Sequence, residues 1–290
     1  MGKSLKPRLM IAIPMVIFGT IAIFVRNIPL SSAQLSLSRA VIAAVVIGIY
    51  LLICGKELKF RALGRDLVLL LISGAAMGIN WILLFEAYKY TTVSVATLSY
   101  YFAPVIIILA CPILFKEKMG AKQWICFVMS TLGIVLITGL GDVSVGGSNL
   151  KGIAFGLGAA CLYAFVVLCN KFIKGVDGIY RTFLQFLAAI VVLLPYVLLT
   201  EGFSLAAMDG KGFLLLAVVG LVHTGVCYCL YFSALGKVSG QEAAILSYAD
   251  PLVAVLASVF VLGETISLPQ IVGGVFILGF TLWNELGKSK

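Results

Sequence analysis

Charged residues are scarce in this sequence. Lys, Arg, Asp and Glu make up 11% of its 290 residues, whereas a soluble domain carries roughly 25%. Hydrophobic residues make up 62%, and the mean hydropathy is +1.14. The shortage of charge excludes an ordinary soluble domain and predicts a protein that lies in a lipid bilayer.

The sequence also lacks the patterns of common catalytic and metal sites. It contains no phosphate-binding loop, no HExxH zinc-protease motif and no GxSxG motif, so neither ATP-driven transport nor hydrolysis is supported. His223 is the only histidine, and with Cys227 it offers too few ligands for a closed zinc site. The seven cysteines fall almost entirely in apolar runs, where no disulfide framework is implied. We therefore expect no cofactor, no bound metal and no enzymatic activity.

Long apolar runs are what the sequence has in abundance. Counting runs that could cross about 30 Å of hydrocarbon predicts ten transmembrane helices. Their expected ranges are 9–25, 34–54, 67–88, 93–115, 123–140, 152–173, 180–200, 211–235, 239–262 and 269–286.

Basic residues alternate between the loops that join these helices. With the N-terminus inside, sixteen of the 21 Lys and Arg residues fall in inner segments and only Arg26, Lys89, Lys151 and Lys211 in outer loops. Lysine and arginine favour the cytoplasmic side. This distribution predicts that both termini are cytoplasmic in a multi-pass protein of the cell membrane. Because the net charge of +9 lies in these short loops, we do not expect nucleic-acid binding.

The second half of the chain repeats the first. Moving the sequence by 147 positions aligns Gly78 with Gly225, Pro104 with Pro251 and Glu117 with Glu264. Such residues do not align by apolar composition alone, so we infer an internal duplication. The predicted units are residues 1–145 and 146–290, with five helices each. Because five is odd, the second unit is expected to be inverted, an architecture typical of alternating-access transporters.

Late in each half the motifs resemble a known family. They read SYYFAPVIIILACPILFKEKMGAKQWICFVMSTLGIVLI and SYADPLVAVLASVFVLGETISLPQIVGGVFILG, and the openings IFGTIAIFVRN and LSLSRAVIAAVV also match. The chain is similar, over essentially its whole length, to the ten-helix EamA-type branch of the drug/metabolite transporter superfamily. This resemblance implies a membrane transporter that exports or exchanges small polar metabolites, including amino acids, or that extrudes drugs.

Two groups of residues are candidates for coupling and movement. Pro104 and Pro251 cannot donate to the preceding helical turn, so each is expected to bend its helix as a hinge, unless it is merely tolerated there. Asp250 is the carboxylate that the sequence places near mid-membrane, where removal from water favours the neutral form. It and His223 are candidates for proton coupling, with structural hydrogen bonding as the alternative for each.

The substrate-binding candidates are polar and aromatic residues within the apolar runs. Arg39 could meet a carboxylate or phosphate, snorkel to the interface, or pair with Glu86. The aromatic residues could equally be packing rather than pocket. Glu117 and Glu264 lie at helix ends, where capping or a local ion pair is favoured over substrate contact. The candidates are Arg39, Asn80, Trp81, Tyr100, Tyr101, Tyr163, Tyr228 and Tyr248.

The sequence thus predicts an all-α secondary transporter with ten transmembrane helices in two inverted five-helix repeats. It would move a small-molecule substrate by alternating access, with protons as a candidate coupling partner, and the resemblance implies export of an amino acid or a similar compound. The first alternative is a multidrug exporter of the same fold. The second is an intramembrane enzyme or a structural membrane protein.

Overall fold

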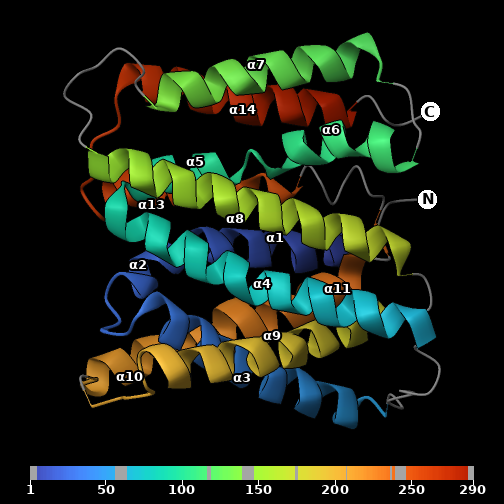
Figure 1. Ribbon diagram of the computed structural model, residues 1–290, viewed down its shortest axis with the longest axis vertical. Coiled ribbons are helices and arrows are strands. Elements are labelled where there is room, and N and C mark those ends of the chain that lie inside the picture. The colour runs from blue at the N-terminus through green and yellow to red at the C-terminus, as the bar shows by residue number, and fades with distance from the viewer. Residues whose placement is uncertain are drawn as a thin grey trace.

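The computed structural model describes residues 5–55, 64–115, 119–138, 147–173, 176–206, 208–235, 237–238 and 246–286. Within these ranges the chain is helical and has no strand. The helices run roughly at right angles to the long axis of the molecule and are stacked along that axis (Figure 1). In chain order they are α1 (Leu5–Gly19), α2 (Ile21–Val25), α3 (Ser32–Ile53), α4 (Gly64–Tyr90), α5 (Val93–Tyr100), α6 (Ala103–Phe115), α7 (Ala121–Thr138), α8 (Gly147–Phe172), α9 (Gly178–Thr200), α10 (Gly210–Ala217), η2 (Val218–Val226), α11 (Cys227–Leu235), α13 (Ala249–Phe260) and α14 (Leu268–Leu286).

Seven spans in the described ranges are long and apolar enough to cross a membrane. They begin at Leu5, Ser32, Asp66, Val93, Gly147, Gly178 and Gly210. The other three predicted spans correspond to shorter apolar helices, Ala121–Ile137, Ala249–Phe260 and Leu268–Asn284. The chain is therefore a multi-span, all-helical membrane protein. Of the ninth predicted span, the described part contains the helix Ala249–Phe260, and residues 239–245 lie outside the described part.

Several predicted spans are interrupted helices. The first is divided at Thr20 into α1 and α2, and the fourth at Tyr101 and Phe102 into α5 and α6. The eighth is one continuous run of three segments, α10, η2 and α11, of which η2 is a π-helix of nine residues. Long π-helical segments are rare and occur frequently at functional sites.

Two expected hinges need a correction. Pro104 is the second residue of α6 and Pro251 the third residue of α13, so neither bends the interior of a continuous helix. In the first turn of a helix the missing N–H of proline has no intrahelical acceptor to lose. Both prolines therefore lie in the first turn of a helix that follows an interruption of the helical span.

Small residues allow close packing at the end of the stack formed by α7 and α14 (Figure 1). A Cβ added to Gly133 would lie 2.6 Å from the Gly273 carbonyl oxygen, and one added to Gly273 would lie 2.5 Å from the Gly133 carbonyl oxygen. The two backbones thus touch directly. Such contacts drive association where lipid surrounds the helices and the hydrophobic effect between them is weak.

The ends of several helices meet on one face of the molecule. There Arg26, after α2, contacts Glu264, after α13, and Thr91, after α4, contacts Asn149 at the start of α8. Ser31 caps α3 by accepting from the Gln34 N–H at 3.1 Å and donates to Glu201 at the end of α9. These loops are the ones that the charge distribution assigned to the outer side.

Candidate functional site

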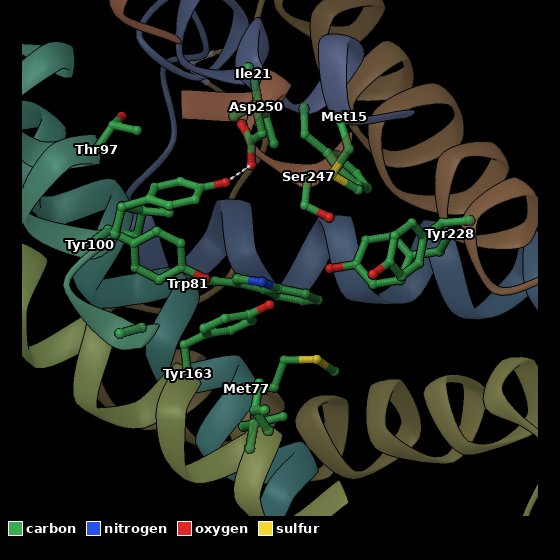
Figure 2. A pocket seen from close by; sticks show the side chains of 18 of the residues that line it. Met15, Ile21, Met77, Trp81, Thr97, Tyr100, Tyr163, Tyr228, Ser247 and Asp250 are labelled. Carbon is green, nitrogen blue, oxygen red and sulfur yellow. Dashed lines mark hydrogen bonds between the residues drawn. The ribbon is translucent and has the colours of Figure 1, made fainter. Parts of the chain in front are cut away.

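A cavity of about 510 Å³ lies between the helices of the two halves. Its walls come from α1, α2, α3, α4, α5, α6, α8, α9, α11 and α13. In Figure 2 Asp250 lies on one wall and Met77 and Tyr163 on the opposite one, with Trp81 between them and Tyr228 to one side. A volume of this size fits a small organic molecule.

Asp250 is positioned at the cavity by two helix interruptions, one between α5 and α6 in the first half and one before α13 in the second. Its Oδ2 accepts a hydrogen bond from the Tyr101 hydroxyl at 2.7 Å (Figure 2). Tyr101 lies in the turn between α5 and α6, and Asp250 lies in the first turn of α13. A Cβ on Gly19 would come within 2.6 Å of the Asp250 carbonyl oxygen, so α1 packs directly against this turn. The carboxylate thus joins residues from both halves of the chain.

Arg39 also lines the cavity. Its surroundings distinguish between a position at the cavity, a position at the membrane interface and an ion pair with Glu86. Its residue surface is only 5% exposed, so it does not snorkel to the interface. Glu86 instead pairs with Lys89, at 2.8 Å. The Arg39 guanidinium carbon lies 4.4 Å from the Trp81 ring centroid, and its Nε donates to the Thr224 hydroxyl at 2.6 Å. Both alternatives to a cavity position are therefore wrong.

The predicted aromatic residues converge on this space. Tyr100 and Tyr163 lie with ring centroids 5.4 Å apart, while Trp81 and Tyr228 each pack edge-on against Phe186, at 5.3 Å and 5.2 Å. All the aromatic candidates line the cavity, namely Trp81, Tyr100, Tyr101, Tyr163, Tyr228 and Tyr248. Pro104 lines it as well, but Pro251 does not.

Two candidates do not reach the cavity. Asn80 is buried between α4 and α8, where its Nδ2 donates to the Ala159 carbonyl at 2.5 Å. His223 lies in η2 with Nε2 3.1 Å from the Thr20 hydroxyl and Nδ1 3.3 Å from the Val218 carbonyl, and its ring packs against Phe24. In the described part of the chain no cluster of three potential metal ligands occurs.

Thr224, which was not among the residues predicted from the sequence, orients Arg39. Thr224 donates from its hydroxyl to the Val219 carbonyl five residues earlier, at 2.9 Å, a spacing that the π-helix permits. Gly220 and Gly225 flank it on the same segment, and a Cβ on either would approach α3 side chains within 2.7 Å. These glycines are a sequence signal of close helix approach, but the π-helix itself has no signature that we could recognise.

Glu264 contacts more residues than the expected helix cap or local ion pair would require. It accepts from Arg26 of the first half, from the Ser258 hydroxyl, and from the Val93 N–H at the start of α5 at 2.8 Å. Arg26 also donates to the Tyr88 and Thr91 carbonyls, each at 2.8 Å. Glu117, the counterpart of Glu264 in the first half, lies outside the described residues.

Known proteins resemble the chain over most of its length. An uncharacterized transporter of Bacillus subtilis, YxxF, is 29% identical over 282 residues, covering 96% of this chain and 90% of that protein. Protein PecM of Dickeya dadantii is 29% identical over 249 residues, covering 84% of this chain and 81% of PecM. The uncharacterized inner membrane transporter YicL of Salmonella typhimurium is 23% identical over 302 residues, covering 100% of this chain and 98% of YicL.

A solved crystal structure has the same fold, with a TM-score of 0.64 at 16% identity and coverage of 95% of this chain and 96% of that one. The model of the EamA-like transporter family matches twice, over residues 5–139 and 150–284. The chain therefore belongs to the EamA-like transporter family.

Proposed function

We propose that this chain is a secondary transporter that exports a small metabolite such as an amino acid by alternating access. The observation that carries the proposal is the cavity, which is built by both halves and has one cationic and one anionic side chain, Arg39 and Asp250, in a wall that is otherwise uncharged and mostly aromatic and apolar. A few precisely placed polar groups in an apolar pocket are typical of small-molecule sites. Transport through such a site requires that it open to each side of the membrane in turn.

The packing of the helices supports two inverted repeats. The 147-residue offset places α7 on α14 and α3 on α9, and each of these helices packs against its own counterpart, as helices beside a two-fold axis do. The contact of α4 with α8 likewise corresponds to that of α11 with α1. The double match of the family model supports the same duplication.

The direction of the counterparts supports the inversion. Gln34, at the start of α3, donates to the Gly202 carbonyl just beyond the end of α9 at 2.9 Å. Equivalent helices therefore run antiparallel. In the proposal the three shorter apolar helices complete ten membrane crossings. The excess of basic residues in every second loop of the sequence supports a cytoplasmic position of both termini.

The proposal is tested with purified protein in liposomes loaded with unlabelled amino acid. The expected result is counterflow of the labelled amino acid into the vesicles, saturable and dependent on the protein. Counterflow of lipophilic cations, competing with one another, would support the multidrug exporter instead. An absence of counterflow for amino acids, nucleosides, sugars and cations would favour an intramembrane enzyme or a structural protein.

A further inference from the structure

In the part of the chain that the structure describes, Arg39 is a buried cation whose two terminal NH₂ groups bind no other residue. Among the described residues its contacts are the Nε hydrogen bond to Thr224 at 2.6 Å and the ring faces of Trp81 and Phe85, at 4.4 and 5.7 Å. None of these carries a negative charge, and none uses the two terminal NH₂ groups. An arginine residue that is 5% exposed and has no anionic partner is unfavourable in a largely apolar site unless an anion joins it.

The carboxylate of the cavity does not fill this role. Asp250 accepts from Tyr101 at 2.7 Å, and no ion pair joins it to Arg39 in the described part of the chain. Both side chains line the same 510 Å³ cavity. A solute between them therefore meets a fork of hydrogen-bond donors at one end and a carboxylate at the other.

The guanidinium is fixed before any solute arrives. Thr224 accepts from Arg39 while it donates to the Val219 carbonyl at 2.9 Å, so its hydroxyl is committed in both directions. The Trp81 ring covers one face of the guanidinium. A donor pair held in this way loses little conformational freedom when it binds a ligand, which is what makes a planar arginine fork selective for carboxylates.

We propose that Arg39 is the carboxylate-binding subsite of the transported solute, with Thr224 as its positioning residue. The proposal rests on the proposed transport function and narrows its substrate class to solutes with a carboxylate, against the lipophilic cations of a multidrug exporter. A single arginine matches the charge of a carboxylate rather than that of a phosphate dianion. An α-amino acid carries a group for each of them, a carboxylate for Arg39 and an ammonium group for Asp250.

The test uses Trp81 as a fluorescent reporter in the full-length protein. Trp124 and Trp283, which are 51% and 42% exposed on the outside of the bundle, are replaced with Phe. Each amino acid is titrated beside the amine that lacks only its carboxylate, as phenylalanine with phenethylamine and leucine with isoamylamine. We expect at least one amino acid to bind 10-fold or more tightly than its amine. Equal binding of both members, binding of amines alone, or no response to any pair would overturn the subsite.

Substitutions then assign the selectivity to the two residues. Arg39→Lys keeps the charge and loses the fork, and is expected to reduce the amino acid preference 10-fold or more. Thr224→Val keeps Arg39 and the shape of its own side chain, and is expected to reduce the same preference about 3-fold to 10-fold. The matched control is Thr281→Val, which removes a similar hydroxyl that donates to the Ile277 carbonyl at 2.6 Å in α14, away from the cavity.

Failure of the Arg39 subsite and failure of the proposed transport function give different results. If wild-type protein shows amino acid counterflow while Arg39→Lys and Thr224→Val both retain the full amino acid preference, the subsite is wrong and the transporter stands. If wild-type protein moves no solute at all, the proposed function fails first. Should Arg39→Lys not fold, as judged by its melting temperature, Thr224→Val against Thr281→Val still decides the subsite.

Discussion

Arg26 and Glu264 form an ion pair although 238 residues separate them in the sequence. The pair joins the two halves of the chain, and Glu264 also binds the N–H of Val93 at the start of α5. A carboxylate at a helix N-terminus interacts favourably with the helix dipole as well as with the N–H. Breaking this group of contacts is required if the loops on this face are to separate.

We therefore expect Glu264→Gln to loosen this face. In protein that carries Ala254→Cys as a reporter on the cavity wall, a membrane-impermeant thiol reagent added on this face should react several-fold faster, because the ion pair is lost and only weaker hydrogen bonds remain. The control is Glu86→Gln, which breaks the Glu86–Lys89 pair within α4 alone. Equal rates in the two variants would contradict a role for Glu264 in closing the cavity.

The helix pattern of this protein could largely be predicted from its sequence, because each span must be apolar over its whole length. The cavity position of Asp250 could be predicted for the same reason, since a carboxylate in an apolar run rarely faces lipid. The partner of Arg39 could not be predicted, because Thr224 is 185 positions away in the sequence and lies in a π-helix. Asn80 was misplaced because a buried amide is satisfied equally well by a backbone carbonyl and by a solute.

The aromatic walls should matter for binding more than exposed aromatic residues do. Replacing Tyr101 or Tyr248 with alanine is expected to weaken solute binding about 10-fold, because each removes ring surface from the cavity and the former also leaves Asp250 without its donor. Phe260→Ala is the control, since Phe260 is 80% exposed on α13 and does not line the cavity. Affinity measured by thermal shift and by counterflow should agree, and equal losses in all three variants would mean that packing had been mistaken for pocket.

The contact between α7 and α14 should be intolerant of added volume. Gly273→Val is expected to destabilise the protein by about 1–3 kcal/mol, because its side chain would have to displace the Gly133 backbone. The melting temperature of detergent-purified protein measures the loss. Gly279→Val is the matched control on α14, where an added Cβ meets nothing within 4 Å. Equal melting temperatures for the two variants would show that the close backbone contact contributes little.

Asp250 should determine whether a pH gradient drives transport, if it is the proton-coupling group. An apolar surrounding favours the neutral form of a carboxylate, whereas the ionised form is the better acceptor for the Tyr101 hydroxyl at 2.7 Å. Protonation of Asp250 is therefore expected to weaken that bond, which links the α5–α6 break to α13. His223, the other candidate, contacts Thr20 and Val218 outside the cavity, so its role in coupling is expected to be smaller.

The variant Asp250→Asn distinguishes solute counterflow from uptake driven by a pH gradient. It keeps a hydrogen-bond acceptor for Tyr101 but cannot ionise, so solute counterflow, which needs no net proton movement, is expected to persist. Uptake driven by a pH gradient is expected to disappear. Both are measured in the same liposome preparation, with His223→Gln as the comparison, which should keep most of the gradient-driven uptake. If Asp250→Asn still responds to the gradient, or if wild-type protein does not, Asp250 has a structural role and the protein is a facilitator.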